Sequence, residues 1–198
     1  MPSPPVVEHL PLYQSTEKFT PQLMEWDQLV EKLQVIIKSD KSDEDKKKEL
    51  DGLSFKMIPG KTSECTSFYN NSVSIFLTPE ENVLIAETNN YRQSKGLFPL
   101  RIVFSLSRCA RKHSEDMFRR GYFSHYSPER TTPWSRARSE NAPFSGENIA
   151  QSGASTISGK EAFELFKWSP DHDENMKGFH RYIGVGIVGN KATQMFGY

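Results

Sequence analysis

The chain has 198 residues, which suits one domain plus an extension, and 36% of them are hydrophobic, enough for one core. Lys and Arg balance Asp and Glu at 25 each, so no net field steers the chain to nucleic acid or to an anionic membrane. No apolar run is long enough to span a bilayer, and residues 1–5 lack the basic and apolar segments of a signal peptide. We therefore expect neither a nucleic-acid partner nor a transmembrane segment.

The two cysteines, Cys65 and Cys109, do not form a disulfide framework, and there is no Cys-x-x-Cys motif. Cys109 falls on the apolar face of an expected helix, which favours a small buried side chain over a disulfide to Cys65. Their pairing, and with it the redox compartment, stays open.

An N-terminal extension over residues 1–77 is expected to be partly helical. Residues 1–20 are rich in Pro, Ser and Thr and indicate a loose lead-in. A helix is expected to follow Thr20 as N-cap, with Pro21 at its first position. Its apolar residues recur at helical spacing: Leu23, Trp26, Val30, Leu33 and Ile37. This stripe must be covered, either by the rest of the chain or by a partner chain.

Two further elements are expected in the extension. A short helix is expected over residues 42–50, with Gly52 just past its end. The segment SVSIFL at 72–77 predicts a short strand with Val73, Ile75 and Leu77 on one face.

The second part of the chain, residues 78–198, predicts three helices and a closing hairpin. Thr78 and Glu81 form a capping box for a helix that ends near Gly96, and a second helix is expected over residues 105–120. A third, over 158–167, has Ser158 and Glu161 at capping-box spacing. Residues 182–188 and 191–196 flank Gly189-Asn190, as in a two-residue β-hairpin. This order predicts an α+β fold with helices on a largely antiparallel sheet.

Several phrases of this second part occur in a recognisable order: NYR at 90–92, GLFPL at 96–100, ARKHSEDM at 110–117, GYFSHYSP at 121–128, GENIA at 146–150, SPDHDENM at 169–176, IGVG at 183–186 and TQMFG at 193–197. Together they resemble the bacterial type of CAP-superfamily (SCP-like) domain, the group of cysteine-rich secretory, antigen 5 and pathogenesis-related proteins. Residues 1–77 have no counterpart in this pattern.

The resemblance implies a three-layer α-β-α sandwich over about residues 78–198. It also implies an extracellular or cell-envelope location, because members are mostly exported. Members have a cleft lined by histidine and glutamate that binds zinc-type metals, and some branches bind lipid or sterol. No single reaction unites them.

By motif, His125, Glu147 and His172 match three of the four cleft residues of the family. The fourth position, a glutamate in eukaryotic members, falls on Ser169. Two further acids are candidate ligands: Glu164, one turn back, and Asp171, which replaces a glycine and could instead cap the short helix expected near His172.

Imidazole and carboxylate together suit Zn²⁺, and two His plus one Glu would leave an open coordination position. The missing fourth acid predicts low affinity. The competing interpretation is that Glu147 and the histidines hydrogen-bond to one another and to backbone, tying loops together.

Other polar residues favour structural roles. His113, on the inner stripe of its helix, is expected to be packed with a satisfied ring nitrogen, whereas His9 and His180 are expected to be exposed. Arg136 and Arg138 indicate solvated faces or carboxylate partners. A Ser-His-Glu hydrolase using Ser124 is awkward, because neighbours on an extended segment point to opposite faces, but Ser127 stays open.

Three functions follow from these features. The leading hypothesis is an exported binding module whose His/Glu cleft holds a divalent metal or a small, peptide or lipid ligand. The second is a metal-dependent hydrolase with His125, Glu147 and His172 as catalytic candidates. The third is a structural envelope protein anchored by its extension.

Overall fold

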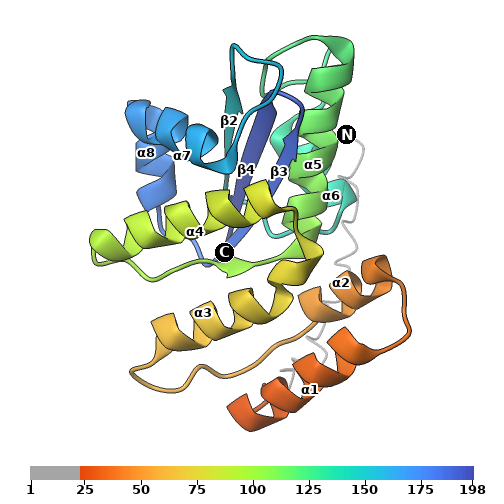
Figure 1. Cartoon of the computed structure of the whole chain (residues 1–198), viewed down its shortest axis with the longest axis vertical. Helices are drawn as coiled ribbons and strands as arrows, with labels where there is room; N and C mark the ends of the chain where they lie inside the picture. Colours follow the sequence, from red (N-terminus) through yellow and green to blue (C-terminus); the bar gives the residue numbers. More distant parts are fainter. Residues whose placement is uncertain (1–22) are drawn as a thin grey trace, which may run out of the picture.

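The computed structural model describes residues 23–198 (Figure 1). The expected helix start at Thr20-Pro21 and the exposed position of His9 lie outside these residues. At the centre is a four-stranded sheet of order β1-β3-β4-β2. Its strands are β1 (Arg101–Ile102), β2 (Gly146–Gln151), β3 (Tyr182–Val188) and β4 (Lys191–Gly197). Only the short β1–β3 pair is parallel among these strands, so the sheet is largely antiparallel, as expected.

Helices cover both faces of the sheet (Figure 1). Helix α5 (Phe104–Arg120) packs on one face, where a Cβ added to Gly184 or Gly186 would meet its backbone. Short helix α6 (Pro133–Ser139) extends that layer, with Ala137 in a core that also contains Leu106. On the other face lie α4 (Pro79–Ser94), α7 (Gly159–Trp168) and α8 (Pro170–Lys177). The fold is the expected α-β-α sandwich.

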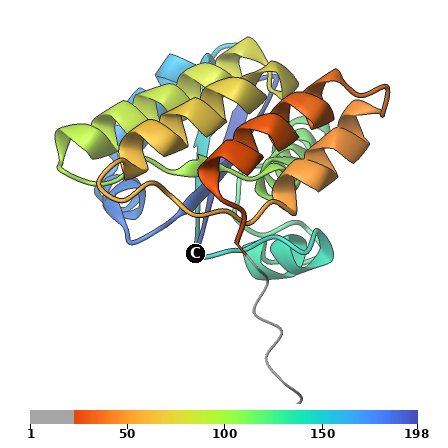
Figure 2. The same ribbon diagram turned by 90° about the horizontal axis from the view of Figure 1, so that it is seen from below.

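The extension adds three helices: α1 (Trp26–Lys38), α2 (Asp43–Asp51) and α3 (Thr62–Val73). They lie beside α4 (Figure 2) and contribute to the same hydrophobic core as the sandwich. Leu29, Leu33 and Leu50 from the extension join Leu84 of α4 and Phe163 of α7 in that core. Residues 23–77 therefore pack on the rest of the chain. The position of a domain boundary at 77/78 stays a prediction.

The prediction that residues 23–25 belong to the first helix was wrong, and the predicted buried face of that helix was partly wrong. Met24 lies in an extended segment, because its backbone bonds to the carbonyl of Ser54 and the N–H of Lys56, and Glu25 is the N-cap. The buried residues are Leu29, Leu33 and Ile36. Leu23 is exposed, and Trp26, Val30 and Ile37 are half-buried at the edge of the stripe.

The strand expected over residues 72–77 was also wrong. Helix α3 continues to Val73, and η1 (Ser74–Phe76), a 3-10 turn, follows it. Val73 and Phe76 face the core at helical spacing, whereas Ile75 is 66% exposed. The alternation of apolar residues was too short to distinguish the two periods.

The other predicted helices and the hairpin are confirmed. The Thr78–Glu81 capping box starts α4, Ser42 caps α2, and α5 ends at Gly121 in the left-handed conformation. Ser158 caps α7 by accepting from the N–H of Glu161, but the reciprocal bond from the Ser158 N–H to the Glu161 side chain is absent, so only half of the expected capping box forms. Strands β3 and β4 form the hairpin around Gly189-Asn190. Helices α3 and α6 and strands β1 and β2 were not anticipated as such.

Candidate functional site

Three elements that are distant in sequence bring the family-pattern residues together. His125 lies in the loop between α5 and α6, Glu147 on the edge strand β2, and His172 on α8. All three line one open cleft of about 540 Å³. The other lining residues are Asn148, Asp171, Glu174, Asn175, Gly178, Phe179, His180 and Tyr198. Asp171 is thus at the cleft, whereas Glu164 is not among its lining residues.

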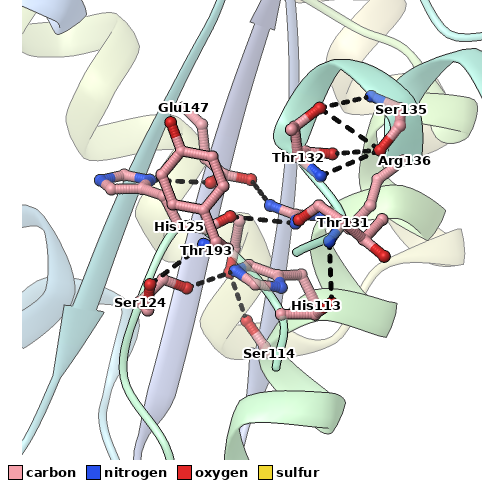
Figure 3. Close-up of polar contacts among 12 residues, drawn as sticks. His113, Ser114, Ser124, His125, Thr131, Thr132, Ser135, Arg136, Glu147 and Thr193 are labelled. Atoms are coloured by element: carbon pink, nitrogen blue, oxygen red, sulfur yellow. Dashed lines mark hydrogen bonds and ion pairs between the residues drawn. The ribbon is translucent and has the colours of Figure 1, made fainter. Parts of the chain in front are cut away.

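Glu147 is the buried anchor of the cleft. Its side chain is only 2% exposed, because it leaves β2 toward α6 and the loop that carries His125. One carboxylate oxygen bonds to Nδ1 of His125 at 2.8 Å, and the other accepts from Nη2 of Arg136 at 2.8 Å (Figure 3). Both oxygens of Glu147 are therefore engaged by protein groups.

The loop that carries His125 has no regular secondary structure and is held by side chains from two helices (Figure 3). A ring nitrogen of His113, on α5, bonds to the carbonyl of Ser124 at 3.0 Å. Arg136, on α6, donates from Nη1 to the carbonyls of His125 and Thr131, each at 3.0 Å. Two consecutive carbonyls beside the imidazole are thus fixed from outside the loop.

His113 is the packed histidine that was expected, since it is 1% exposed and its ring is hydrogen-bonded. Burial is the main reason that its pKa is lowered to about 4. His113 therefore stays neutral at physiological pH and serves the scaffold of the cleft.

His172 occupies the opposite wall of the cleft. Its ring packs edge-on against Phe166, with centroids 5.5 Å apart, and its carbonyl accepts from Nδ2 of Asn148. Burial lowers the pKa of His172; the nearby His125 lowers it further, and Asp171 opposes this. The expectation that Asp171 caps α8 was wrong, since the N-cap is Ser169.

His180 was expected to be exposed, and this was wrong. It is half-buried and stacks on Phe196 with centroids 4.7 Å apart. One ring nitrogen bonds to the hydroxyl of Ser145 at 2.8 Å and the other to the carbonyl of Asn175 at 3.0 Å. Burial is the main cause of its lowered pKa. The residue joins the loop after α8 to the start of β2.

The donor chemistry fits a metal only in part. Within residues 23–198, no group of three or more His, Cys, Asp or Glu residues is placed to hold an ion. Each oxygen of Glu147 is already engaged, one by His125 and the other by Arg136, so the cleft offers chiefly the two imidazoles of His125 and His172. Neutral imidazole suits Zn²⁺, and two such ligands leave the remaining coordination positions to water or a bound molecule.

Two cysteines and two serines do not line the His/Glu cleft. Cys65 and Cys109 are both buried and free, so they do not pair. Ser127 is 9% exposed and lines a different cavity, and the Ser124 hydroxyl accepts from the N–H of Tyr126.

The sequence pattern did not identify Arg136 as part of the site, although it allowed a carboxylate partnership. The aromatic residues Phe179 and Tyr198 at the cleft were also missed. No pattern in the sequence distinguishes them from other surface aromatics.

The chain is similar to several bacterial proteins. It is 36% identical over 141 residues to the uncharacterized protein YkwD of Bacillus subtilis (strain 168), covering 69% of this chain and 52% of YkwD. A crystal structure of an extracellular protein containing a SCP domain from Bacillus anthracis str. Ames matches with a TM-score of 0.55 and 26% identity, over 72% of this chain and 44% of that one. The chain thus spans about half the length of these two relatives.

An outer surface protein from Borrelia burgdorferi shares the fold, with a TM-score of 0.51 and 21% identity, over 60% of this chain and 91% of that one. Among the helices of residues 23–198, none is long and apolar enough to cross a bilayer. Residues 85–197, more than half of the chain, match the family described as "CAP: Cysteine-rich secretory protein family". The chain belongs to this family.

Proposed function

We propose that this chain is an exported binding module whose cleft holds a divalent metal ion weakly, through His125 and His172, together with a small polar or peptide ligand. The observation that carries the proposal is the convergence of two imidazoles on one solvent-open cleft. Among the described residues, Nε2 of His125 and both ring nitrogens of His172 have no hydrogen-bond partner. Unbonded imidazole nitrogens in an open cleft are available to a ligand.

The composition of the cleft supports a polar ligand over a lipid. Its lining is mostly histidine, acidic and amide side chains, with Phe179 and Tyr198 as the large aromatic contributors. Two acids at the rim, Asp171 and Glu174, form no ion pair with another described residue. These groups favour a cation or a hydrogen-bonding molecule.

Binding is favoured over hydrolysis by the state of Glu147. In a metal-dependent hydrolase, Glu147 would have to ligate the metal or take a proton from water. Here its two oxygens are held by His125 and Arg136, and its side chain is buried. A metal-dependent hydrolase and an envelope-anchored structural protein are the two alternative functions, and metal-dependent turnover of a generic peptide or ester substrate would favour the first of them.

An extracellular or cell-surface location is proposed from the relatives. The Bacillus anthracis relative is described as extracellular, and the Borrelia burgdorferi protein, which shares only the fold, as an outer surface protein. Secretion by the native host, followed by fractionation, tests this part of the proposal.

Calorimetric titration of Zn²⁺ tests the binding part. We expect a Kd in the micromolar to millimolar range at pH 7.5, about −4 to −8 kcal/mol. Affinity should fall at pH 5.5, because protons compete for imidazole. His172→Ala should lose at least about tenfold, since one imidazole then remains, whereas Glu164→Gln, outside the cleft, should match the parent. Equal affinity in the parent and His172→Ala would place the metal elsewhere.

A further inference from the structure

Arg136, on α6, joins strand β2 to the loop that carries His125. Its side chain is 11% exposed, and its two terminal nitrogens contact three acceptors. Nη2 donates to Glu147, and Nη1 donates to the carbonyls of His125 and Thr131 (Figure 3). One guanidinium therefore holds both the carboxylate that contacts the imidazole and the backbone that carries it.

The charge of Arg136 has a consequence for Glu147. The Glu147 carboxylate is 2% exposed and forms an ion pair at 2.8 Å with the guanidinium of Arg136, a group that can only donate hydrogen bonds. An ionised carboxylate has no proton to donate and can only accept hydrogen bonds. The 2.8 Å contact between Glu147 and Nδ1 of His125 then requires the proton to be on Nδ1.

The proton on Nδ1 decides what the rest of the ring can do. In neutral histidine only one ring nitrogen carries hydrogen, so Nε2 keeps its lone pair. Nε2 lies on the side of the ring away from Glu147 (Figure 3), and the side chain is 41% exposed at the cleft. A carboxylate behind a histidine is a known way to fix the tautomer of a ligand imidazole.

We propose that Arg136 is a positioning residue of the cleft: through Glu147 and the His125 carbonyl it holds the His125 ring in place, as the Nδ1–H tautomer with the Nε2 lone pair available to a ligand. This rests on the proposed function for its ligand, but the geometry at His125 is a property of the free protein. Arg136 itself is not among the residues that line the cleft.

The test compares Arg136→Gln, Arg136→Lys and Arg138→Gln with the parent at pH 7.5. Arg138 lies on the same helix and is exposed, and its side chain makes no hydrogen bond or ion pair to a described residue, so its variant is a matched control. Long-range ¹H–¹⁵N spectra report the tautomer of His125 in each protein without any ligand. Calorimetric titration with Zn²⁺ alone measures the metal affinity of the cleft in each protein.

We expect His125 to be the Nδ1–H tautomer in the parent and in Arg138→Gln. In Arg136→Gln it should change to a mixture or to Nε2–H, and zinc affinity should fall at least about tenfold. Arg136→Lys should restore the parent tautomer, because an ammonium still pairs with Glu147. An unchanged tautomer in a folded Arg136→Gln would overturn the proposal.

If Arg136→Gln does not fold, the Arg136→Lys variant tests the positioning role of Arg136 instead. A lysine reaches Glu147 but makes fewer of the three contacts, so zinc affinity between those of the parent and His172→Ala is expected. Affinity and tautomer both equal to the parent, with the His125 loop resonances unshifted, would contradict a positioning role. A parent with the Nδ1–H tautomer that binds no Zn²⁺ would refute the proposed function while leaving this inference standing.

Discussion

The carboxylate of Asp51 accepts a hydrogen bond from the backbone N–H of Phe104 at 2.6 Å, and its second oxygen accepts from the N–H of Ser105 at 2.6 Å. Phe104 is the first residue of α5, whose own N-cap, Val103, makes no side-chain capping bond. A residue of α2, 53 positions earlier in sequence, thus caps the helix that covers one face of the sheet. The extension thus supplies a cap to a helix of the sandwich.

Removing this cap should destabilise the whole chain. We expect Asp51→Ala to lower the free energy of unfolding by about 1–2 kcal/mol, the usual cost of losing an N-cap, since two N–H groups lose their acceptor. Asp40→Ala, at an exposed position between α1 and α2, should stay within about 0.5 kcal/mol of the parent. Urea unfolding of the three proteins measures this. Equal midpoints for Asp51→Ala and the parent would show that solvent replaces the cap at no cost.

The glycines of β3 allow α5 to approach the sheet. A Cβ on Gly186 would lie 2.2 Å from the Cα of Arg111, far inside contact distance with backbone that cannot rotate away. We expect Gly186→Ala to cost about 1–3 kcal/mol or more, measured by thermal and urea unfolding. Gly153→Ala is the matched control, because no atom lies within 4 Å of its added Cβ. Similar stability of both variants would mean that α5 shifts without penalty.

Capping signals and long helices were predicted well because they are local. Thr78 with Glu81 and the left-handed Gly121 determine helix ends through neighbours within a few residues. The hairpin was predictable for the same reason. Ile75 shows the limit: its alternation with Val73 and Leu77 fits a strand, but tertiary packing of Val73 and Phe76 gives a helix and a 3-10 turn.

The site was only partly predictable from sequence. Motif order placed His125, Glu147 and His172 at one cleft, yet the state of Glu147 depends on Arg136, which the sequence does not connect to it. His180 was misjudged because its ring stacks on Phe196 of β4, a contact between residues that are distant in sequence. Side-chain partnerships between distant elements are not encoded in local pattern.

The thiol chemistry of the chain follows from burial. Cys65 and Cys109 are 2% and 1% exposed and unpaired, and burial raises the pKa of the Cys109 thiol to about 12. We expect a thiol reagent at pH 8 to modify neither cysteine rapidly in the folded protein and both after denaturation in the absence of reductant. Detection of fewer than two thiols in the unfolded chain would reveal a disulfide that the structure does not contain.

His113 should make the protein sensitive to acid. Its folded pKa of about 4 lies below the unfolded value of about 6.5, so the folded state binds fewer protons between these values. The contribution of His113 to the free energy of unfolding is therefore fully present above about pH 6.5. It is lost as the pH falls toward 4, by about 3 kcal/mol in total. His113→Gln keeps a donor for the Ser124 carbonyl but cannot take up a proton.

The measurement is the free energy of unfolding of the parent and His113→Gln at pH 7.5, 5.5 and 4.5. The variant is expected to be less stable at pH 7.5, because an amide fills the space of the ring imperfectly. Below about pH 6.5 the gap should narrow by about 1.4 kcal/mol per pH unit, as the parent alone loses the contribution of this histidine. A gap that stayed constant from pH 7.5 to 4.5 would show that His113 titrates alike in the folded and unfolded chain, and a His113 ring titrating near pH 6.5 by NMR would show the same directly.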